Sequence, residues 1–218
     1  MFHDHRLFFR QFRENFHTTG SIAPSSRWLA RALARFVAAG ESANRHPRRI
    51  LEVGPGTGAV THWILPALAA QDRLDLVEMN DQFVAHLRLR FQNEPAWQAF
   101  QPRTRILHQG VQDLTPDGGY DAIVSGLPLN NFSGELVEQL LATLTGLLAP
   151  GGTLSFFEYV AVRQAKLLIA RGDERTRLRA ISQHLGRLLG THEFRRDCVL
   201  RNVPPAWVHH VCVGSKRL

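Results

Sequence analysis

The stretch that decides the fold is Ile50-Leu51-Glu52-Val53-Gly54-Pro55-Gly56-Thr57-Gly58. An apolar strand ends in an acid, and three glycines then follow at every second position. A strand that runs through a Gly-rich turn into a helix brings backbone N–H groups close to a ligand. The spacing is G-x-G-x-G, which differs from the G-x-G-x-x-G of dinucleotide sites. Because Glu52 would repel a pyrophosphate, the pattern favours a cationic ligand at this corner.

A second acidic residue ends the next apolar segment. Leu74-Asp75-Leu76-Val77-Glu78 is typical of a strand, and Glu78 follows Gly58 by twenty residues. An acid at the C-terminal end of a second parallel strand can accept hydrogen bonds from both ribose hydroxyls. That position would serve NAD equally well, so Glu78 alone does not decide the ligand. Together with Glu52 and the glycines it favours S-adenosylmethionine, which carries a sulfonium and an ammonium.

Strands and helices are expected to alternate along the central part of the chain. The predicted elements are strand 49–53, helix 59–70, strand 74–78, helix 81–92, strand 104–108, strand 120–125, helix 134–148 and strand 153–160. Such alternation predicts a parallel sheet with helices on both faces. Pro150-Gly151-Gly152 is predicted to form a turn before the fifth strand. Strands near 194–201 and 206–213, joined by a turn at Pro204-Pro205, complete the chain.

The N-terminal segment carries an aromatic stripe. Residues 4–17 are predicted to form a helix in which Phe8, Phe12 and Phe16 recur at every fourth position, flanked by Arg6, Arg10 and Arg13. A basic helix with an aromatic stripe suits a membrane interface, although packing on the domain core explains the same pattern. A second helix at 27–39 would be capped by Ser25 or Ser26. Residues 163–190 are predicted to form a basic helical pair.

Composition limits the classes of partner and compartment. The chain of 218 residues has a formal net charge of +7 and a sequence pI near 10.6, which favours a nucleic acid or an anionic membrane surface as a partner. We find no run of eighteen apolar residues and no signal peptide, so we expect a cytoplasmic protein. Cys198 and Cys212 are expected to be packed thiols, and the histidine pairs form no convincing metal site.

The glycine turn, the acid after the second strand and the Pro-Gly-Gly segment together resemble class I S-adenosylmethionine-dependent methyltransferases. The resemblance covers about residues 45–160. It implies an α/β, Rossmann-like, seven-stranded sheet with an antiparallel last strand. The chain would then divide into N-terminal amphipathic helices (1–44), which associate with a membrane and cover the cofactor, and a methyltransferase domain (45–218). The cofactor contacts that the resemblance implies are Ser25, Glu52, Gly54, Pro55, Gly56, Thr57, Gly58, Glu78, Met79, Gly110, Val111 and Ser125.

One position departs from the pattern of these methyltransferases. Many members have an acid after the third strand that binds the adenine amino group. This chain has Gln109-Gly110-Val111-Gln112-Asp113 there. We therefore assign adenine binding to the backbone of Gly110 and Val111 and leave the role of Asp113 open.

A narrower resemblance rests on two further segments. These are Thr19-Gly20-Ser21-Ile22-Ala23-Pro24-Ser25-Ser26-Arg27-Trp28-Leu29-Ala30 and Ser125-Gly126-Leu127-Pro128-Leu129. Together they look like the bacterial phospholipid N-methyltransferases, which methylate phosphatidylethanolamine, and their relatives that act on ornithine lipids. The resemblance implies an enzyme of lipid metabolism, peripheral on the inner face of the cytoplasmic membrane. We expect it to act as a monomer on an aminolipid substrate.

The main alternative is an adenine N-methyltransferase acting on ribosomal RNA or another nucleic acid. Those enzymes have a motif beginning Asn-Leu-Pro-Tyr or Asn-Ile-Pro-Tyr after the fourth strand. Here the motif is Ser125-Gly126-Leu127-Pro128-Leu129, so the amide clamp and the ring that stacks on a base are missing. This departure makes nucleic acid an unlikely substrate.

Candidate catalytic residues lie where strands four and five end, the usual ligand edge of such sheets. The Leu127 carbonyl can accept a hydrogen bond from an amine. Glu158 can take a proton, and Tyr159 can offer a ring face to a quaternary ammonium. Neighbouring strand residues face opposite sides of a sheet, and we favour Tyr159 as the one in the pocket. The expected substrate contacts are Gly126, Pro128, Asn130, Arg163 and Lys166.

Overall fold

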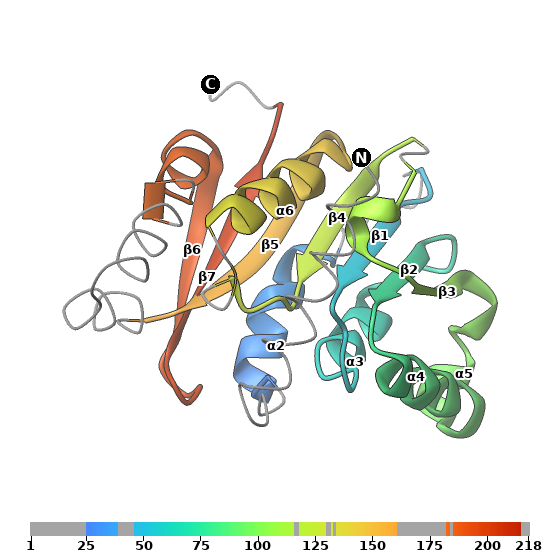
Figure 1. Cartoon of the computed structure of the whole chain (residues 1–218). Coiled ribbons are helices and arrows are strands. Elements are labelled where there is room, and N and C mark those ends of the chain that lie inside the picture. The colour runs from blue at the N-terminus through green and yellow to red at the C-terminus, as the bar shows by residue number, and fades with distance from the viewer. Residues whose placement is uncertain are drawn as a thin grey trace.

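The computed structural model of the chain describes residues 25–38, 46–115, 118–129, 132, 134–160, 182–183 and 185–214. Within these residues, seven strands form one sheet in the order β3-β2-β1-β4-β5-β7-β6 (Figure 1). Their bounds are β1 Arg49–Val53, β2 Arg73–Glu78, β3 Thr104–His108, β4 Tyr120–Ser125, β5 Leu148–Tyr159, β6 Glu193–Val199 and β7 Ala206–Cys212. β7 is antiparallel to both of its neighbours, which confirms the predicted antiparallel last strand.

The helices alternate with these strands as predicted, although the helices predicted for 27–39, 59–70 and 134–148 are shorter in the structure. They are α2 Arg27–Leu33, α3 Thr61–Ile64, α4 Asp81–Asn93, α5 Pro95–Gln98 and α6 Gly134–Gly146. Single 3-10 turns occupy Ala34–Phe36, Leu65–Ala67, Gln101–Arg103 and Val111–Asp113. The helix predicted for 59–70 narrows to α3 and a 3-10 turn because Pro66 has no N–H to continue an α-helical ladder. The sequence did not predict α5.

The turn predicted at Pro150-Gly151-Gly152 is wrong, because these residues belong to β5. The pairing of β5 with β4 slips there: Tyr120 faces Leu148 and Ala122 faces Thr153. A Cβ on Gly152 would lie 2.6 Å from the Tyr120 carbonyl oxygen, so glycine is required where the strand bends.

Two apolar layers cover the sheet. On one face, α2 packs on β5, β6 and β7, and α4 packs on β2 and β3, with α3 and α5 in the same layer. The fully buried residues of this layer include Leu29, Leu33 and Trp97. On the other face, α6 packs through Val137, Leu140 and Leu144. Helix α2, which precedes β1, lies in the first layer and therefore forms part of the core. The domain boundary predicted at residue 44 falls outside the described residues.

Several predicted features cannot be compared with the structure. The aromatic helix at 4–17 and most of the basic pair at 163–190 lie outside the described residues.

Ser26, rather than Ser25, caps α2, because its hydroxyl accepts the Leu29 N–H. No helix in the described part of the chain combines the length and apolar character needed to cross a bilayer.

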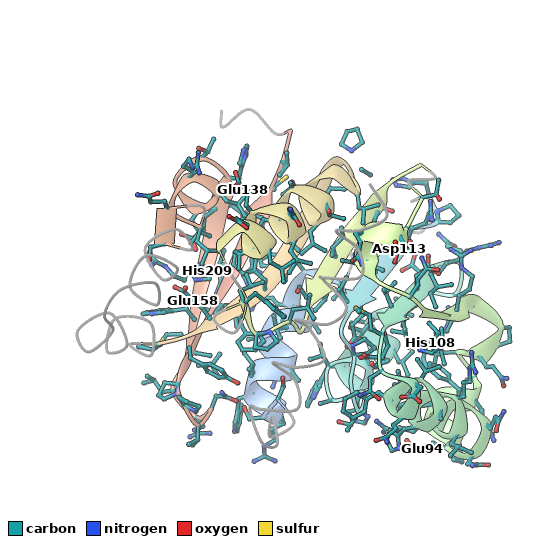
Figure 2. All side chains as sticks on the ribbon, viewed as in Figure 1. Glu94, His108, Asp113, Glu138, Glu158 and His209 are labelled. Atoms are coloured by element: carbon teal, nitrogen blue, oxygen red, sulfur yellow. The ribbon has the colours of Figure 1, made fainter. Side chains whose placement is uncertain are left out.

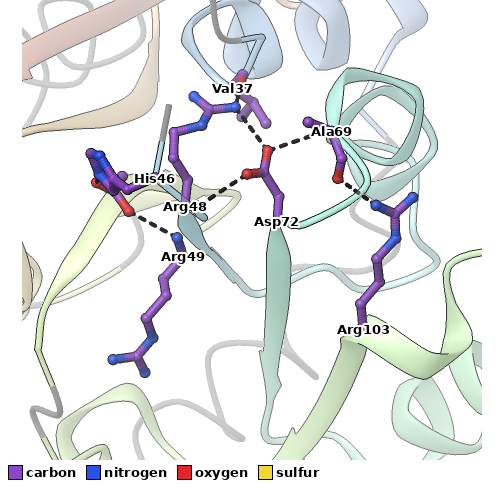
Figure 3. A network of polar contacts seen from close by, with 8 residues as sticks. Val37, His46, Arg48, Arg49, Ala69, Asp72 and Arg103 are labelled. Carbon is purple, nitrogen blue, oxygen red and sulfur yellow. Dashed lines mark hydrogen bonds and ion pairs between the residues drawn. The ribbon is translucent and has the colours of Figure 1, made fainter. Parts of the chain in front are cut away.

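A buried carboxylate fixes the edge of the sheet where β1 and β2 begin (Figure 3). Asp72 is fully buried and accepts hydrogen bonds from the backbone N–H groups of Arg48 and Ala69, at 3.0 and 3.1 Å. The Arg48 guanidinium donates to Asp72 at 3.2 Å and also to the Val37 carbonyl. The network therefore joins the end of the first helical segment to the start of the sheet.

Replacing Asp72 by Ala should lower the free energy of unfolding by about 3–5 kcal/mol, because the largely buried Arg48 charge would lose its partner. Urea denaturation measures this loss. The control variant Asp81→Ala, at an exposed position in α4, should cost less than about 1 kcal/mol. Equal effects of the two variants would contradict this role of Asp72.

Candidate active site

The glycine loop after β1 combines left-handed backbone with close packing. Gly54, Gly56 and Gly58 have φ angles of 70°, 56° and 81°, which favour glycine. A Cβ on Gly54 would lie 2.8 Å from the Leu127 side chain, and one on Gly58 would lie 2.6 Å from Trp97. At Gly56 nothing lies within 4 Å of that position. Gly54 and Gly58 therefore allow Leu127 and Trp97 to pack against the loop, whereas Gly56 borders open space.

Helix α4 contacts this loop through the side chain of Arg90. The Arg90 guanidinium donates to the Thr57 carbonyl at 2.9 Å, stacks 3.8 Å above the Trp97 ring and pairs with Glu94, which Figure 2 labels. The Pro55 carbonyl accepts the Gly58 N–H at 2.8 Å, which closes the turn. Pro55 and Thr57, both predicted cofactor contacts, therefore shape the loop through their carbonyls.

Glu52 is the next-to-last residue of β1 and lies in a fully enclosed position. It is 1% exposed, and one carboxylate oxygen accepts from the Thr61 hydroxyl at 2.7 Å. The other oxygen, Oε1, is buried without a hydrogen-bond partner. Burial, together with the nearby Glu78, raises the pKa of Glu52 to about 8. A carboxyl held in this state would be stabilised in its charged form by a cation.

Glu78 ends β2 and faces the glycine loop. Its Oε2 accepts the Gly56 N–H at 3.0 Å, and its Oε1 accepts the N–H groups of Met79 and Asn80 at 2.9 Å. Burial raises the pKa of Glu78, and these backbone donors act against that rise. The second acidic residue predicted from sequence thus lies against the loop, as the cofactor assignment requires.

The ends of the other strands complete this edge of the sheet. A small hollow is lined by Gly54, Glu78, Met79, Val111 and Leu127, together with Val53, Val77, Gln109 and Leu140. Gly110 and Val111 are buried beside it. Ser125 is fully buried, and its hydroxyl accepts the Leu127 N–H at 3.4 Å. Thus Gly54, Glu78, Met79, Val111 and Leu127, predicted separately from sequence, line one hollow.

The loop after β4 lies directly against the glycine loop. The Gly126 N–H donates to the Val53 carbonyl at 2.9 Å, and a Cβ on Gly126 would lie 2.7 Å from the Gly54 carbonyl oxygen. Leu127, Pro128 and Leu129 are buried. The contact brings the predicted acceptor residues beside the predicted cofactor residues.

Glu158 and Tyr159 face opposite sides of β5. Tyr159 packs beside Phe157 on the face covered by α2, and their rings lie 5.3 Å apart. Burial raises the pKa of the Tyr159 hydroxyl, so this phenol stays protonated near neutral pH. Tyr159 can therefore offer a ring or a hydrogen-bond donor, but not a base.

Glu158 belongs to a chain of titratable groups that sequence reasoning missed. Figure 2 shows Glu158 next to His209 of β7, and the Glu158 Oε1 lies 3.4 Å from the His209 Nε2. The His209 Nδ1 lies 2.6 Å from Glu193, at the start of β6. Only the fold brings these three residues together, because they come from three different strands and Glu158 is distant in sequence from the other two. The neighbouring His210 faces the other side of β7, where its Nδ1 lies 2.8 Å from the Ser155 hydroxyl.

The remaining predicted site residues do not line this hollow in the described part of the chain. Asn130, Arg163 and Lys166 lie outside the described residues. Ser25 precedes α2 and is half-buried. In the described part of the chain, no three His, Cys, Asp or Glu side chains gather to hold a metal ion. Gln112 is not among the site residues predicted from the sequence. Both polar atoms of its side-chain amide are nevertheless buried without a hydrogen-bond partner.

The residues present fit S-adenosylmethionine. The unpaired Glu52 oxygen suits an ammonium, Glu78 suits a diol, and Gly56 borders a space that any side chain would enter. The unpaired Gln112 amide packs over Gly110, where adenine binding is expected. These features agree with the ligand deduced from the sequence.

Comparisons with known proteins agree with the fold. A family described as "Methyltransferase domain" matches residues 51–154. An ornithine lipid N-methyltransferase from Singulisphaera acidiphila is 33% identical over 152 residues, which span 70% of this chain and 76% of that protein. A ribosomal RNA small subunit methyltransferase A from a Synechococcus strain is 35% identical over 113 residues, spanning 51% and 38% of the two chains.

A solved structure shows the same architecture. An O-methyltransferase from Streptomyces achromogenes, in complex with S-adenosylmethionine, aligns with a TM-score of 0.59 and 16% identity. The alignment covers 86% of this chain and 79% of that one. At this identity the likeness concerns the fold.

The raised pKa of Glu52 predicts a pH-dependent stability. The unfolded carboxyl ionises near 4.5 and the folded one near 8, so the folded state holds an extra proton between these values. The free energy of unfolding should therefore fall as pH rises through this window, by up to about 1.4 kcal/mol per pH unit.

In Glu52→Gln this contribution should disappear, because the amide cannot ionise. Thermal melts at several pH values should show the variant melting higher than wild type at pH 8 and similarly at pH 4. The control Glu135→Gln, at an exposed position in α6, should keep the wild-type profile. A Glu52→Gln profile parallel to wild type would contradict the buried, protonated state.

Glu78→Ala should weaken S-adenosylmethionine binding by about 1–3 kcal/mol, because two ribose hydroxyls lose a charged acceptor. Calorimetry gives the affinity directly. Glu78→Gln serves as the matched variant: its amide oxygen can still accept from the Gly56 N–H, so the loop keeps its support. Unchanged affinity in both variants would remove the ribose assignment.

Proposed function

The chain belongs to the class I S-adenosylmethionine-dependent methyltransferases, and from this premise we propose that it methylates the primary amine of a membrane lipid head group. The substrate would be phosphatidylethanolamine or an ornithine lipid. The observation that carries the proposal is the 33% identity to an ornithine lipid N-methyltransferase over most of both chains. The residues at the end of β5 give this proposal a chemical basis.

The cofactor supplies an activated methyl group on a sulfonium, so the protein mainly has to align the amine and remove its proton. Glu52 would contact the cofactor's ammonium, Glu78 its ribose, and the Gly110 and Val111 backbone its adenine. Ser25, Met79 and Ser125 would add contacts around it.

An amine substrate requires a proton acceptor. A lipid amine has a free pKa of roughly 10, like that of Lys, so at neutral pH it is protonated and cannot attack. Glu158 is the group suited to take the proton, since Tyr159 stays protonated. The bond to Glu193 fixes His209 so that its Nε2 faces Glu158. The His209 Nε2 would thus lie 3.4 Å from the carboxyl that takes up the proton.

Tyr159 and the β4 loop would position the amine. The Leu127 carbonyl can accept from the amine. Because Glu158 and Tyr159 face opposite sides of β5, we place the amine over the end of that strand, where the Tyr159 ring can face a methylated ammonium. Gly126 and Pro128 would line the head-group pocket with Asn130. Arg163 and Lys166 would meet the phosphate or carboxylate of the head group.

Methylation of adenine in RNA is the second candidate, favoured by the similarity to a ribosomal RNA methyltransferase. The loop after β4 argues against an RNA substrate. Leu127 and Leu129 are buried in the apolar layer under α6, and no aromatic side chain stands at these positions to stack on a base. The lipid amine therefore remains the better substrate. On this proposal the enzyme works as a monomer, peripheral on the cytoplasmic face of the membrane.

The proposal is tested with purified full-length protein, radiolabelled S-adenosylmethionine and three substrates: phosphatidylethanolamine in micelles, ornithine lipid in micelles, and ribosomal RNA. Transfer of label to an aminolipid is the expected result. Transfer to RNA alone would establish the second candidate and overturn the first.

Glu158→Gln should reduce aminolipid turnover about 10²–10⁴-fold, because the proton acceptor is lost, while cofactor affinity stays near wild type. Tyr159→Phe keeps the ring and should retain turnover, whereas Tyr159→Ala should lose it. Wild-type turnover in Glu158→Gln would show that another group, or water, removes the proton.

A further inference from the structure

The turn between β6 and β7 carries an unusual exposed apolar pair. Leu200 is 73% exposed and Val203 is 91% exposed, the highest values among the large apolar side chains that the structure describes. Neither supports the core, and they lie three residues apart at one tip. Exposed apolar residues gathered at one place indicate a contact with another surface.

The tip lies at the catalytic edge of the sheet. Tyr159, which ends β5, pairs with Ala206, which begins β7, and the Val160 N–H donates to the Pro205 carbonyl at 2.7 Å. In Figure 1 the β6–β7 turn and the C-terminal ends of β1, β4 and β5 point the same way. Whatever binds the tip therefore lies beside the proposed acceptor site.

Helix α2 adds a basic and aromatic surface next to the tip. Trp28 is flanked by two guanidinium groups, that of Arg27 at 4.9 Å and that of Arg201 at 4.7 Å from the ring centroid. Arg27 and Arg31 lie one turn apart on the exposed side of α2. Between α2, α3 and β6 runs a groove of about 750 Å³ lined by Trp28, Arg31, Trp63 and Arg201.

The charge of this surface is positive. The acidic residue that lines the groove is Asp197, and it already pairs with Arg35 at 3.0 Å and Arg195 at 2.9 Å. Arginines, a tryptophan at the rim and protruding aliphatic side chains are the combination that binds an anionic lipid surface.

The tip is also held in place before any partner arrives. The buried Asn202 accepts the Ser26 N–H at 3.3 Å and donates to the Pro204 carbonyl at 2.7 Å. This side chain ties the turn to the start of α2. The apolar pair and the arginines therefore form one surface of fixed shape, made of Arg27, Trp28, Arg31, Leu200, Arg201 and Val203.

We propose that this tip surface docks on an anionic membrane, with Leu200 and Val203 entering the lipid and the arginines contacting lipid phosphates. The inference rests on the proposed lipid substrate, and it places the membrane against the edge where the β5 residues end. It is separate from the N-terminal residues 4–17, for which a membrane role was predicted from sequence alone.

The test uses full-length protein and sedimentation with vesicles of equimolar phosphatidylglycerol and phosphatidylcholine. Leu200→Asp/Val203→Asp and Arg27→Glu/Arg31→Glu should each weaken partitioning by at least about tenfold. Binding by wild type should fall as salt rises. Matched controls on α4, Leu89→Asp and Arg88→Glu, change exposed residues away from the tip and should bind like wild type.

Melting temperature and cofactor affinity, both expected to match wild type, show that the variants are folded. Vesicle binding equal to wild type in both tip variants would overturn the docking surface, as would loss on deleting residues 1–17 without any loss in the tip variants. Retention on RNA but not on vesicles would overturn it as well.

Turnover on micellar aminolipid separates this inference from the proposed function. Tip variants that lose vesicle binding yet keep micellar turnover support both. A wild-type protein that binds vesicles through the tip but methylates no aminolipid would contradict the function and leave the surface standing.

Discussion

The site depends on the hydrogen bond between the Gly56 N–H and the Glu78 carboxylate. This 3.0 Å bond joins the loop after β1 to the end of β2. It holds the backbone N–H groups of the glycine turn beside the buried Glu78 carboxylate. Glu52 lies close to Glu78. The negative charge of Glu78 adds to the effect of burial and raises the pKa of Glu52 further. Two buried acids are costly unless a ligand completes them, which is why this corner identifies the cofactor.

The two edges of the sheet have different roles. Where β1 and β2 begin, the buried Asp72 accepts hydrogen bonds from the Arg48 guanidinium and from the backbone N–H groups of Arg48 and Ala69, so this carboxylate is fully engaged with the protein. Where the strands end, polar atoms of Glu52 and Gln112 stay buried without partners. The first edge supplies rigidity, and the second keeps the polar groups that a ligand needs.

Much of the fold was predictable because its signals are local. The bounds of β1, β3 and β4 were predicted to the residue, since each strand is a short segment with an aliphatic centre between turn signals. The error at Pro150-Gly151-Gly152 arose because a strand irregularity and a turn use the same residue types. The cofactor acids were predictable from their place after strands. Glu193 and His209 were not, because their contact with Glu158 exists only once β5, β6 and β7 pair.

The central claim is that this cofactor edge serves a lipid amine. The most direct measurement is mass spectrometry of total lipids from a bacterial host that makes phosphatidylethanolamine and ornithine lipids and expresses this chain. We expect new aminolipid species heavier by whole methyl groups, absent when the host expresses the Glu78→Ala variant. Unchanged lipids together with newly methylated adenines in ribosomal RNA would contradict it.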